Sequence, residues 1–231
     1  MQAVADEMHL AATAFVWPLA DGWQLRWFSP TSELALCGHG TLASAHVLLE
    51  RGDAPPDRVI HFTTAAGLLS ANRRDDRIEL DFPVEPSTPA DAPPDLLGAL
   101  GQAPVGIERN RFDYLVELES EEAVRAACPD LTRLLRVQTR GVIITARSST
   151  APGDFVSRFF APSVGIDEDA VTGSAHCCLG PYWQRYLGKA QMIGIQLSRR
   201  GGVVHVQVDG DRVRLGGQAV TVLRGELVRP A

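Results

Sequence analysis

The sequence predicts an α+β protein made of two similar halves, in each of which a sheet encloses one central helix. Short runs rich in β-branched and aromatic residues recur along the 231-residue chain, separated by Gly, Pro or charged turns. Two segments that open on glycine turns, "CGHGTLASAHVLLERG" at 37–52 and "VTGSAHCCLGPYWQRYLG" at 171–188, are predicted helices with almost no polar face. A helix of this kind must be enclosed, and the surrounding strands can enclose it.

The first half is predicted to be rich in strands. Its strand candidates are 12–19, 22–30, 58–67, 68–74 and 77–86, with the helix of 37–52 between the second and the third. A proline-rich stretch, "PVEPSTPADAPPD" at 83–95, is unsuited to a central strand and is the best candidate for a domain boundary. We therefore place the first domain at 1–86.

The second domain is placed at 96–218 and has the same order of elements. Strands are expected near 112–120, 141–147 and 154–162, with a helix over 121–136 between the first two. The helix of 171–188 follows, and strands are expected over 192–201, 202–210, 211–217 and 218–228. The last of these, near 219–231, is expected to return to the first domain. The Ala, Ser, His and Leu that follow both glycine turns form a weak internal repeat.

The composition excludes several classes of partner. A net charge of −6 argues against binding to nucleic acid, which requires a concentrated basic surface. No segment reaches the roughly 18 apolar residues of a membrane span. The N-terminal segment lacks a basic leader, and the four cysteines show no C-x-x-C spacing. The expectation is a cytoplasmic protein that binds a small molecule.

The two predicted helix starts are candidate anion sites. The first N–H groups of a helix have no partner within it, and the positive end of the helix dipole favours an anion. Two such starts across one cleft would hold a small carboxylate, because glycines let a ligand reach the backbone and hydroxyls add donors. The candidate substrate-binding residues are Gly38, Gly40, Thr172, Gly173 and Ser174.

His39 and Asp169 are the candidate catalytic residues. Proton transfer beside a carboxylate builds negative charge that pre-oriented N–H groups stabilise, and it requires an acid or base nearby. His39 lies between two glycines at a helix start and has no evident packing role. Asp169 could instead cap the helix, and on this argument alone Asp167 and Glu168 are equal candidates. This chemistry needs no metal and no organic cofactor.

Other conspicuous side chains have simpler interpretations. Cys37 is a further candidate, although a buried structural thiol is the simpler interpretation of a free cysteine. His46 and His176, which lie inside the predicted helices, suit the core or an interface. The run at 176–178 is a poor metal cluster, because neighbouring side chains on a helix point about 100° apart.

Two long stretches closely resemble the phenazine biosynthesis-like (PhzF-like) family, whose fold is that of diaminopimelate epimerase. They are "RWFSPTSELALCGHGTLASAHVLLE" and "SRFFAPSVGIDEDAVTGSAHCCLGPYWQRYLGK", with "SRRGG" downstream. The resemblance implies two pseudo-symmetric domains, each a β-barrel-like sheet around a central helix, and a homodimer. It also implies a cofactor-independent isomerase that transfers a proton on a small carboxylate between the domains, with His39, Asp169, Gly173 and Ser174 at the matching positions.

The sequence departs from the family pattern in two respects. Members usually carry about 30 more N-terminal residues, including a first strand and a Gly-Asn-Pro loop. The family pattern Asn-x-Ser-Glu-(Thr/Ser)-x-Phe corresponds here to "HLAATAF", so that His9, Ala11 and Ala12 stand for Asn, Ser and Glu. The Glu is the family's proton-shuttling base, and an alanine methyl cannot carry a proton.

Three hypotheses follow. The first is an isomerase of small carboxylates: either it is weak or inactive because Ala12 replaces the Glu, or His39, Asp169, His9 or Cys37 has taken over, or the activity has changed to another reaction. The second is a non-catalytic relative that binds a carboxylate or a protein partner. The third is a defective chain that lacks a first strand and leaves a sheet edge open. Cys37 also resembles the first active-site cysteine of diaminopimelate epimerase. That enzyme needs a second cysteine, and Thr172 stands at the partner position, so two-thiol epimerisation is not expected.

Overall fold

The computed structural model describes residues 1–228, and its first half contains two helices and six strands. These elements are α1 (Gln2–Met8), β1 (Thr13–Pro18), β2 (Trp23–Phe28), β3 (Glu33–Leu34), α2 (Gly38–Arg51), β4 (Ile60–Thr64), β5 (Gly67–Arg74) and β6 (Arg77–Pro83). The helix predicted over 37–52 and all five predicted strands are present. Helix α1 and the short strand β3 were not predicted.

The second half contains the remaining elements. They are β7 (Thr88–Pro89), α3 (Pro94–Leu100), β8 (Gly106–Arg109), β9 (Asp113–Glu117), α4 (Glu121–Ala126), α5 (Leu131–Leu134), β10 (Gly141–Arg147), β11 (Phe155–Phe160), the 3-10 turn η1 (Pro162–Val164), α6 (Gly173–Leu187), β12 (Gln191–Gln196), β13 (Gly202–Asp209) and β14 (Arg212–Gly217). Among residues 1–228, no helix is long and apolar enough to cross a bilayer.

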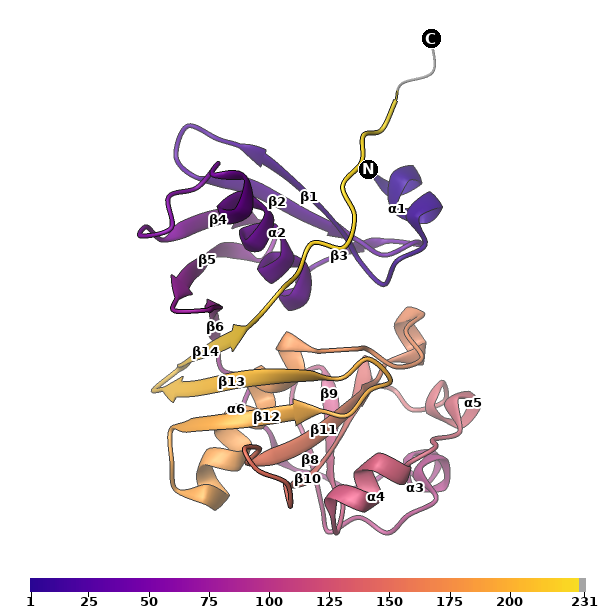
Figure 1. Ribbon diagram of the computed structural model, residues 1–231. Coiled ribbons are helices and arrows are strands. Elements are labelled where there is room, and N and C mark those ends of the chain that lie inside the picture. Colours follow the sequence, from indigo (N-terminus) through magenta and orange to yellow (C-terminus); the bar gives the residue numbers. More distant parts are fainter. Residues whose placement is uncertain (229–231) are drawn as a thin grey trace.

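The strands form one 14-stranded sheet in which a single unit occurs twice. In the first half β1 pairs antiparallel with β2, α2 follows, β4 returns parallel to β2, and β5 and β6 continue antiparallel. Strands β10 to β14 repeat this arrangement around α6. The units meet where β6 pairs antiparallel with β14, which we call the seam. Figure 1 shows one half above the seam and the other below it, each curving around its helix. The predicted α+β fold with two pseudo-symmetric halves is confirmed.

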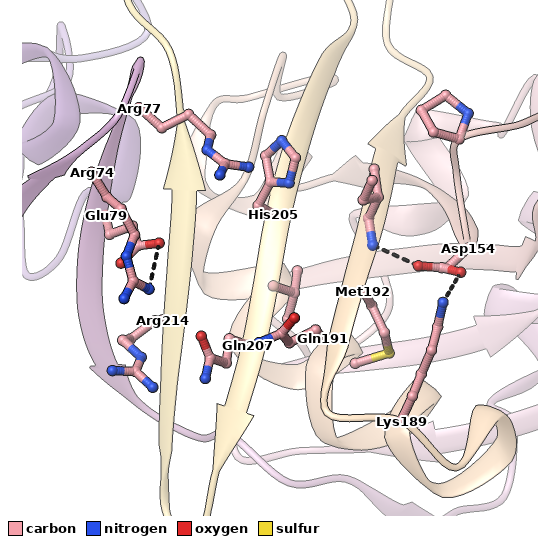
Figure 2. Close-up of a pocket in the computed structure, with 13 residues that line it drawn as sticks. Arg74, Arg77, Glu79, Asp154, Lys189, Gln191, Met192, His205, Gln207 and Arg214 are labelled. Carbon is pink, nitrogen blue, oxygen red and sulfur yellow. Dashed lines mark hydrogen bonds and ion pairs between the residues drawn. The ribbon is translucent and has the colours of Figure 1, made fainter.

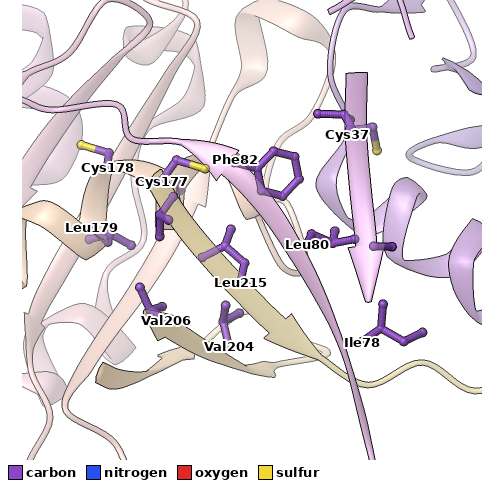
Figure 3. Close-up of a cluster of buried hydrophobic side chains, with 14 of the residues drawn as sticks. Cys37, Ile78, Leu80, Phe82, Cys177, Cys178, Leu179, Val204, Val206 and Leu215 are labelled. Carbon is purple, nitrogen blue, oxygen red and sulfur yellow. The ribbon is translucent and has the colours of Figure 1, made fainter. Parts of the chain in front are cut away.

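Alternating side chains place the main core on the helix side of the sheet. In β13, for example, Val204, Val206 and Val208 are buried, while His205 and Gln207 lie on the outer face. The main core runs without a break across the seam from Cys37 beside α2 to Cys177 on α6, as Figure 3 shows. Hydrophobic burial therefore joins the two halves as well as stabilising each one.

A second core lies in the C-terminal half alone. It contains residues of α3, α4 and α5 together with residues of β9, β10 and β11. The single helix predicted over 121–136 is two short helices, since α4 ends at Ala126 and α5 begins at Leu131. Pro129 lies between them, and a proline both lacks an N–H and disfavours helical geometry at the preceding residue.

The strand expected near 219–231 is not present in the described part of that segment. Residues 218–228 are irregular, and 229–231 lie outside the described residues. The segment nevertheless runs back along the first half (Figure 1), where Thr221 donates to Glu50 and Arg224 forms an ion pair with Glu50 at 3.0 Å. Val220 and Val222 remain 80% and 91% exposed. β propensity alone does not make a strand where no neighbouring strand pairs with it.

Candidate active site

The two central helices begin in contact with each other. A Cβ added to Gly38 would lie 3.1 Å from the Cα of Gly173, and one added to Gly173 would lie 3.2 Å from the Cα of Gly38. These glycines open α2 and α6, which are equivalent helices of the two units. Among residues 1–228, the side chains of the N-cap residues Cys37 and Thr172 make no capping bond. Two sets of uncapped backbone N–H groups therefore meet in the middle of the molecule.

His39 lies in the first turn of α2 beside Cys37. Its Nε2 atom is 3.5 Å from the Cys37 Sγ atom. Burial by itself lowers the pKa of His39, but the hydrogen bond and charge of Cys37 and the charge of Asp169 raise that pKa to about 9, against a smaller opposing effect of Arg200. The imidazole is therefore mostly protonated at neutral pH, and it lies within electrostatic reach of Asp169 on the other half.

Asp169 is buried just before α6, and its carboxyl group is oriented by a short chain of hydrogen bonds. The Gln196 Nε2 group donates to the Thr172 Oγ1 atom at 3.1 Å, and an amide NH₂ can only donate. The Thr172 hydroxyl consequently directs its own proton to the Asp169 Oδ2 atom, at 2.7 Å.

Gln196 holds the same turn through its backbone. Its Nε2 group donates to the Asp169 carbonyl at 2.8 Å, and its Oε1 atom accepts from the Thr172 N–H at 2.8 Å. Gln196 is fully buried at the end of β12. This residue was not among the predicted site residues, although it continues the inward-facing alternation of Met192 and Gly194, where a polar side chain needs a partner.

His176 fixes the same turn from within α6. Its Nδ1 atom is 2.8 Å from the Thr172 carbonyl oxygen, which can only accept, so Nδ1 carries the proton. Burial lowers the pKa of His176 to about 4, opposed in part by the Thr172 carbonyl and the charge of Asp169. This histidine is neutral at physiological pH and lies in the core, as expected.

Ser174 lies in the first turn of α6 and is held by Arg140. The Arg140 Nη2 group donates to the Ser174 Oγ atom at 3.1 Å, while the same guanidinium is paired with the buried carboxyl group of Asp113. Arg140 adds a fixed positive charge beside the helix start. It was not predicted from the sequence, because the parallel pairing of β9 with β10 sets its position and no local motif signals it.

The three positions that depart from the family pattern lie at the entry to β1. His9 is exposed and has a left-handed backbone, with φ of 50°. Ala11 is also exposed, whereas Ala12 is half-buried against the main core, to which Cys37 also belongs.

Two other cysteines lie farther along α6 and are buried. Burial raises the pKa of Cys177 far above its usual range and that of Cys178 to about 11, so both remain thiols at neutral pH. Among residues 1–228, no three metal-ligating side chains come together.

Two surface hollows in the described part of the chain lie elsewhere. One is on the outer face of the sheet at the seam, and the other lies beside His46 and Glu50 near the C-terminal segment. Neither includes His39 or Asp169. The two helix starts are in direct contact at Gly38 and Gly173. A ligand at these starts would therefore lie beside this contact and not between the two glycines.

Known proteins are similar to this chain in sequence and in fold. The model of the family described as phenazine biosynthesis-like protein matches residues 1–225. An uncharacterised isomerase of Halalkalibacterium halodurans is 50% identical over 99% of this chain and 86% of its own length. An uncharacterised isomerase of Pseudomonas aeruginosa is 48% identical over 98% and 86%. The crystal structure of a PhzF-family protein of Enterococcus faecalis superimposes with a TM-score of 0.93 at 36% identity, covering 99% of this chain and 86% of that one. A probable proline racemase, 15% identical with a TM-score of 0.57, shares the fold.

Proposed function

Because the chain belongs to the phenazine biosynthesis-like family, we propose that it is a cofactor-independent isomerase that moves a proton on a small carboxylate substrate. The observation that carries the proposal is the meeting of two uncapped helix starts beside His39 and Asp169. The N–H groups of these starts would hold the substrate carboxylate. They would also stabilise the negative charge that develops when the adjacent carbon loses its proton.

The charges of His39 and Asp169 indicate which of them is the acid and which is the base. With a pKa of about 9, His39 enters the reaction as an imidazolium and acts as the general acid. Asp169, whose Oδ2 atom accepts a hydrogen bond from the Thr172 hydroxyl, acts as the base. In the forward step Asp169 takes the proton from the carbon next to the carboxylate, and His39 gives a proton to a second carbon. The site is reset when Asp169 returns its proton to His39.

The remaining candidate residues shape the substrate site in this scheme. Gly38 and Gly173 let the two helix starts come together, and Gly40 lets the Trp27 ring pack against the first turn of α2, so a ligand would meet the N–H groups beside these contacts. Ser174 presents its hydroxyl beside the Arg140 guanidinium. Cys37 adjusts the protonation of His39 through the contact between its Sγ and the imidazole.

Ala12 favours a second candidate function. A side chain without a titratable group stands where the family pattern has its base, so the chain could bind a carboxylate without turning it over. On this alternative the helix starts remain a carboxylate site, while His39 and Asp169 serve affinity rather than proton transfer. The homodimer implied by the family resemblance belongs to both proposals.

Deuterium exchange tests the proposal directly. The chain is incubated in D₂O with a panel of cyclic and α-substituted carboxylates, and NMR follows loss of the proton next to the carboxylate. We expect exchange by the wild type and a decrease of about 10² to 10⁴ in His39→Gln and in Asp169→Asn. Asp167→Asn is the matched control, because Asp167 is an exposed acid two residues away.

Each result separates the candidates. Exchange that survives both His39→Gln and Asp169→Asn would exclude the proposed mechanism. If no carboxylate exchanges, yet one of them raises the unfolding temperature of the wild type and not of a Ser174→Leu variant, the non-catalytic alternative is supported.

A further inference from the structure

The outer face of the sheet carries a hollow of about 400 Å³ at the seam, away from the helix starts. It spans strands β5, β6, β14, β13 and β12 (Figure 2). Gly216 lies between two of its walls: a Cβ added there would be 3.3 Å from the Cβ of His205 and 3.6 Å from the Cγ of Glu79. The absence of a side chain at this position therefore lets His205 and Glu79 approach each other closely across β14.

The hollow is basic in an acidic protein. Four cationic side chains line it, against two acidic ones, Glu79 and Asp154. The cations are Arg74, Arg77, Lys189 and Arg214. Lys189 is paired with Asp154 and Arg74 with Glu79, whereas Arg77 and Arg214 form no ion pair with either of these acids (Figure 2). The whole chain has a net charge of −6, so this face attracts anions against the overall charge of the molecule.

The arginines of the hollow lack close partners within the described chain. Arg74 is 3.6 Å from Glu79, and the ion pairs of Arg77 and Arg214 with neighbouring aspartates are both 3.8 Å long, beyond hydrogen-bond distance. The Nε atoms of Arg77 and Arg214 are both buried without a hydrogen-bond partner among residues 1–228.

Two arginines elsewhere in the protein show what a closely paired guanidinium looks like. Arg26 makes two bonds to Glu33 at 2.8 and 2.7 Å, and Arg158 makes two to Glu168 at 2.6 and 3.1 Å. The arginines of the hollow have only ion pairs of 3.6 to 3.8 Å, so their guanidinium groups are available to a ligand that supplies acceptors.

We propose that this hollow binds a small phosphate ester. Guanidinium groups pair with phosphate through two parallel hydrogen bonds, and Arg77 and Arg214 lie on the adjacent strands β6 and β14. A phosphate group offers more acceptor oxygens and more charge than a monocarboxylate does, which suits three arginines around one space. The organic part of the ester would lie toward Gln191 and Gln207, which face each other across β12 and β13. The site is independent of the proposed isomerase site.

Titration calorimetry with inorganic phosphate and with glycerol 2-phosphate tests this, using acetate as the monoanion and NaCl to hold the ionic strength constant. We expect saturable binding of both phosphates, tighter for the ester. Arg77→Gln and Arg214→Gln should each weaken binding about tenfold or more, since each removes charge-assisted hydrogen bonds. Arg58→Gln is the control, because it removes the same charge from an exposed position outside the hollow.

Two further measurements keep the test decisive if an arginine variant unfolds. Glu79→Gln removes an acid from the hollow and should tighten phosphate binding. The Nε–H signals of Arg77 and Arg214 in ¹⁵N NMR should shift on titration with phosphate, while that of Arg58 should not. The proposal is overturned if phosphate gives no saturable binding, if Arg58→Gln weakens binding as much as Arg77→Gln, or if the arginines instead mediate association between two copies of the chain.

Discussion

The charge state of His39 gives the sharpest prediction. A histidine with a pKa of about 9 in the folded chain and about 6.5 in the unfolded chain contributes about 3 kcal/mol to the free energy of unfolding. Since the folded value is the higher one, this contribution is fully present below pH 6.5 and is lost as the pH rises to about 9. The stability of the wild type should decrease across that range, relative to a His39→Asn variant.

Removing Cys37 and Asp169, which raise the pKa of His39, should turn this upward shift into a downward one. Cys37→Ala should lower the pKa of His39 more than Asp169→Asn does, because the hydrogen bond and charge of Cys37 outweigh the charge of Asp169. With both removed, burial alone should bring it below the ordinary value of about 6.5. Asp167→Asn, in the same loop but exposed, should leave it unchanged.

An NMR titration of the His39 ring, combined with urea unfolding at about pH 6 and about pH 9, measures both effects. Comparison with His39→Asn at each pH separates His39 from the buried Cys178 thiol, whose raised pKa also makes stability decline at alkaline pH. The reasoning would be refuted if His39 in the wild type titrated at or below about 6.5, or if neither Cys37→Ala nor Asp169→Asn changed its pKa.

Substitutions at three other positions of the site have defined expected outcomes. Gly38→Ala should lower the free energy of unfolding in urea by about 1 to 2 kcal/mol, because the added Cβ would meet the Gly173 backbone at 3.1 Å. The helix preference of alanine offsets only part of that strain. A stabilised variant would contradict the contact. Gln196→Leu should lower the free energy of unfolding by about 3 kcal/mol, since the Thr172 N–H and the Asp169 carbonyl lose their partners. It should also shift the pKa of His39. An unchanged His39 titration would mean that Gln196 does not orient Asp169. Ala12→Glu should raise the rate of deuterium exchange of a small carboxylate followed by NMR, because it restores a titratable group at the family's base position. A rate equal to that of the wild type would contradict the presence of position 12 at the site.

Most of the fold followed from local pattern. Alternation in segments such as 202–210 and 211–217 predicts the strands, and glycine turns predict the starts of both central helices. Pairing is not local: the sequence does not indicate that β6 meets β14, nor that 219–228 has no strand neighbour. A pattern of β-prone residues predicts a strand only if the fold supplies a partner for it.

The candidate site was predictable in part for the same reason. A glycine turn with an adjacent polar residue is enough to single out His39, whereas only the family resemblance separates Asp169 from Asp167 and Glu168. The groups that hold the two helix starts in place come from distant parts of the chain: Gln196 from β12, and Arg140 from the residue just before β10. A glutamine at an inward position of a strand is a usable signal for such a role, whereas the position of Arg140 depends on a parallel pairing across 27 residues.

The seam also sets an order of events while the chain is being made. Strand β6 is complete early in synthesis, but Arg212 of β14, which pairs with Asp81 of β6, follows 131 residues later. Until those residues leave the ribosome, one edge of the N-terminal unit has unpaired backbone groups and an uncovered part of the shared core. A nascent chain stalled within the second unit should therefore be protease-sensitive and bind chaperones, and both properties should disappear once β14 has emerged.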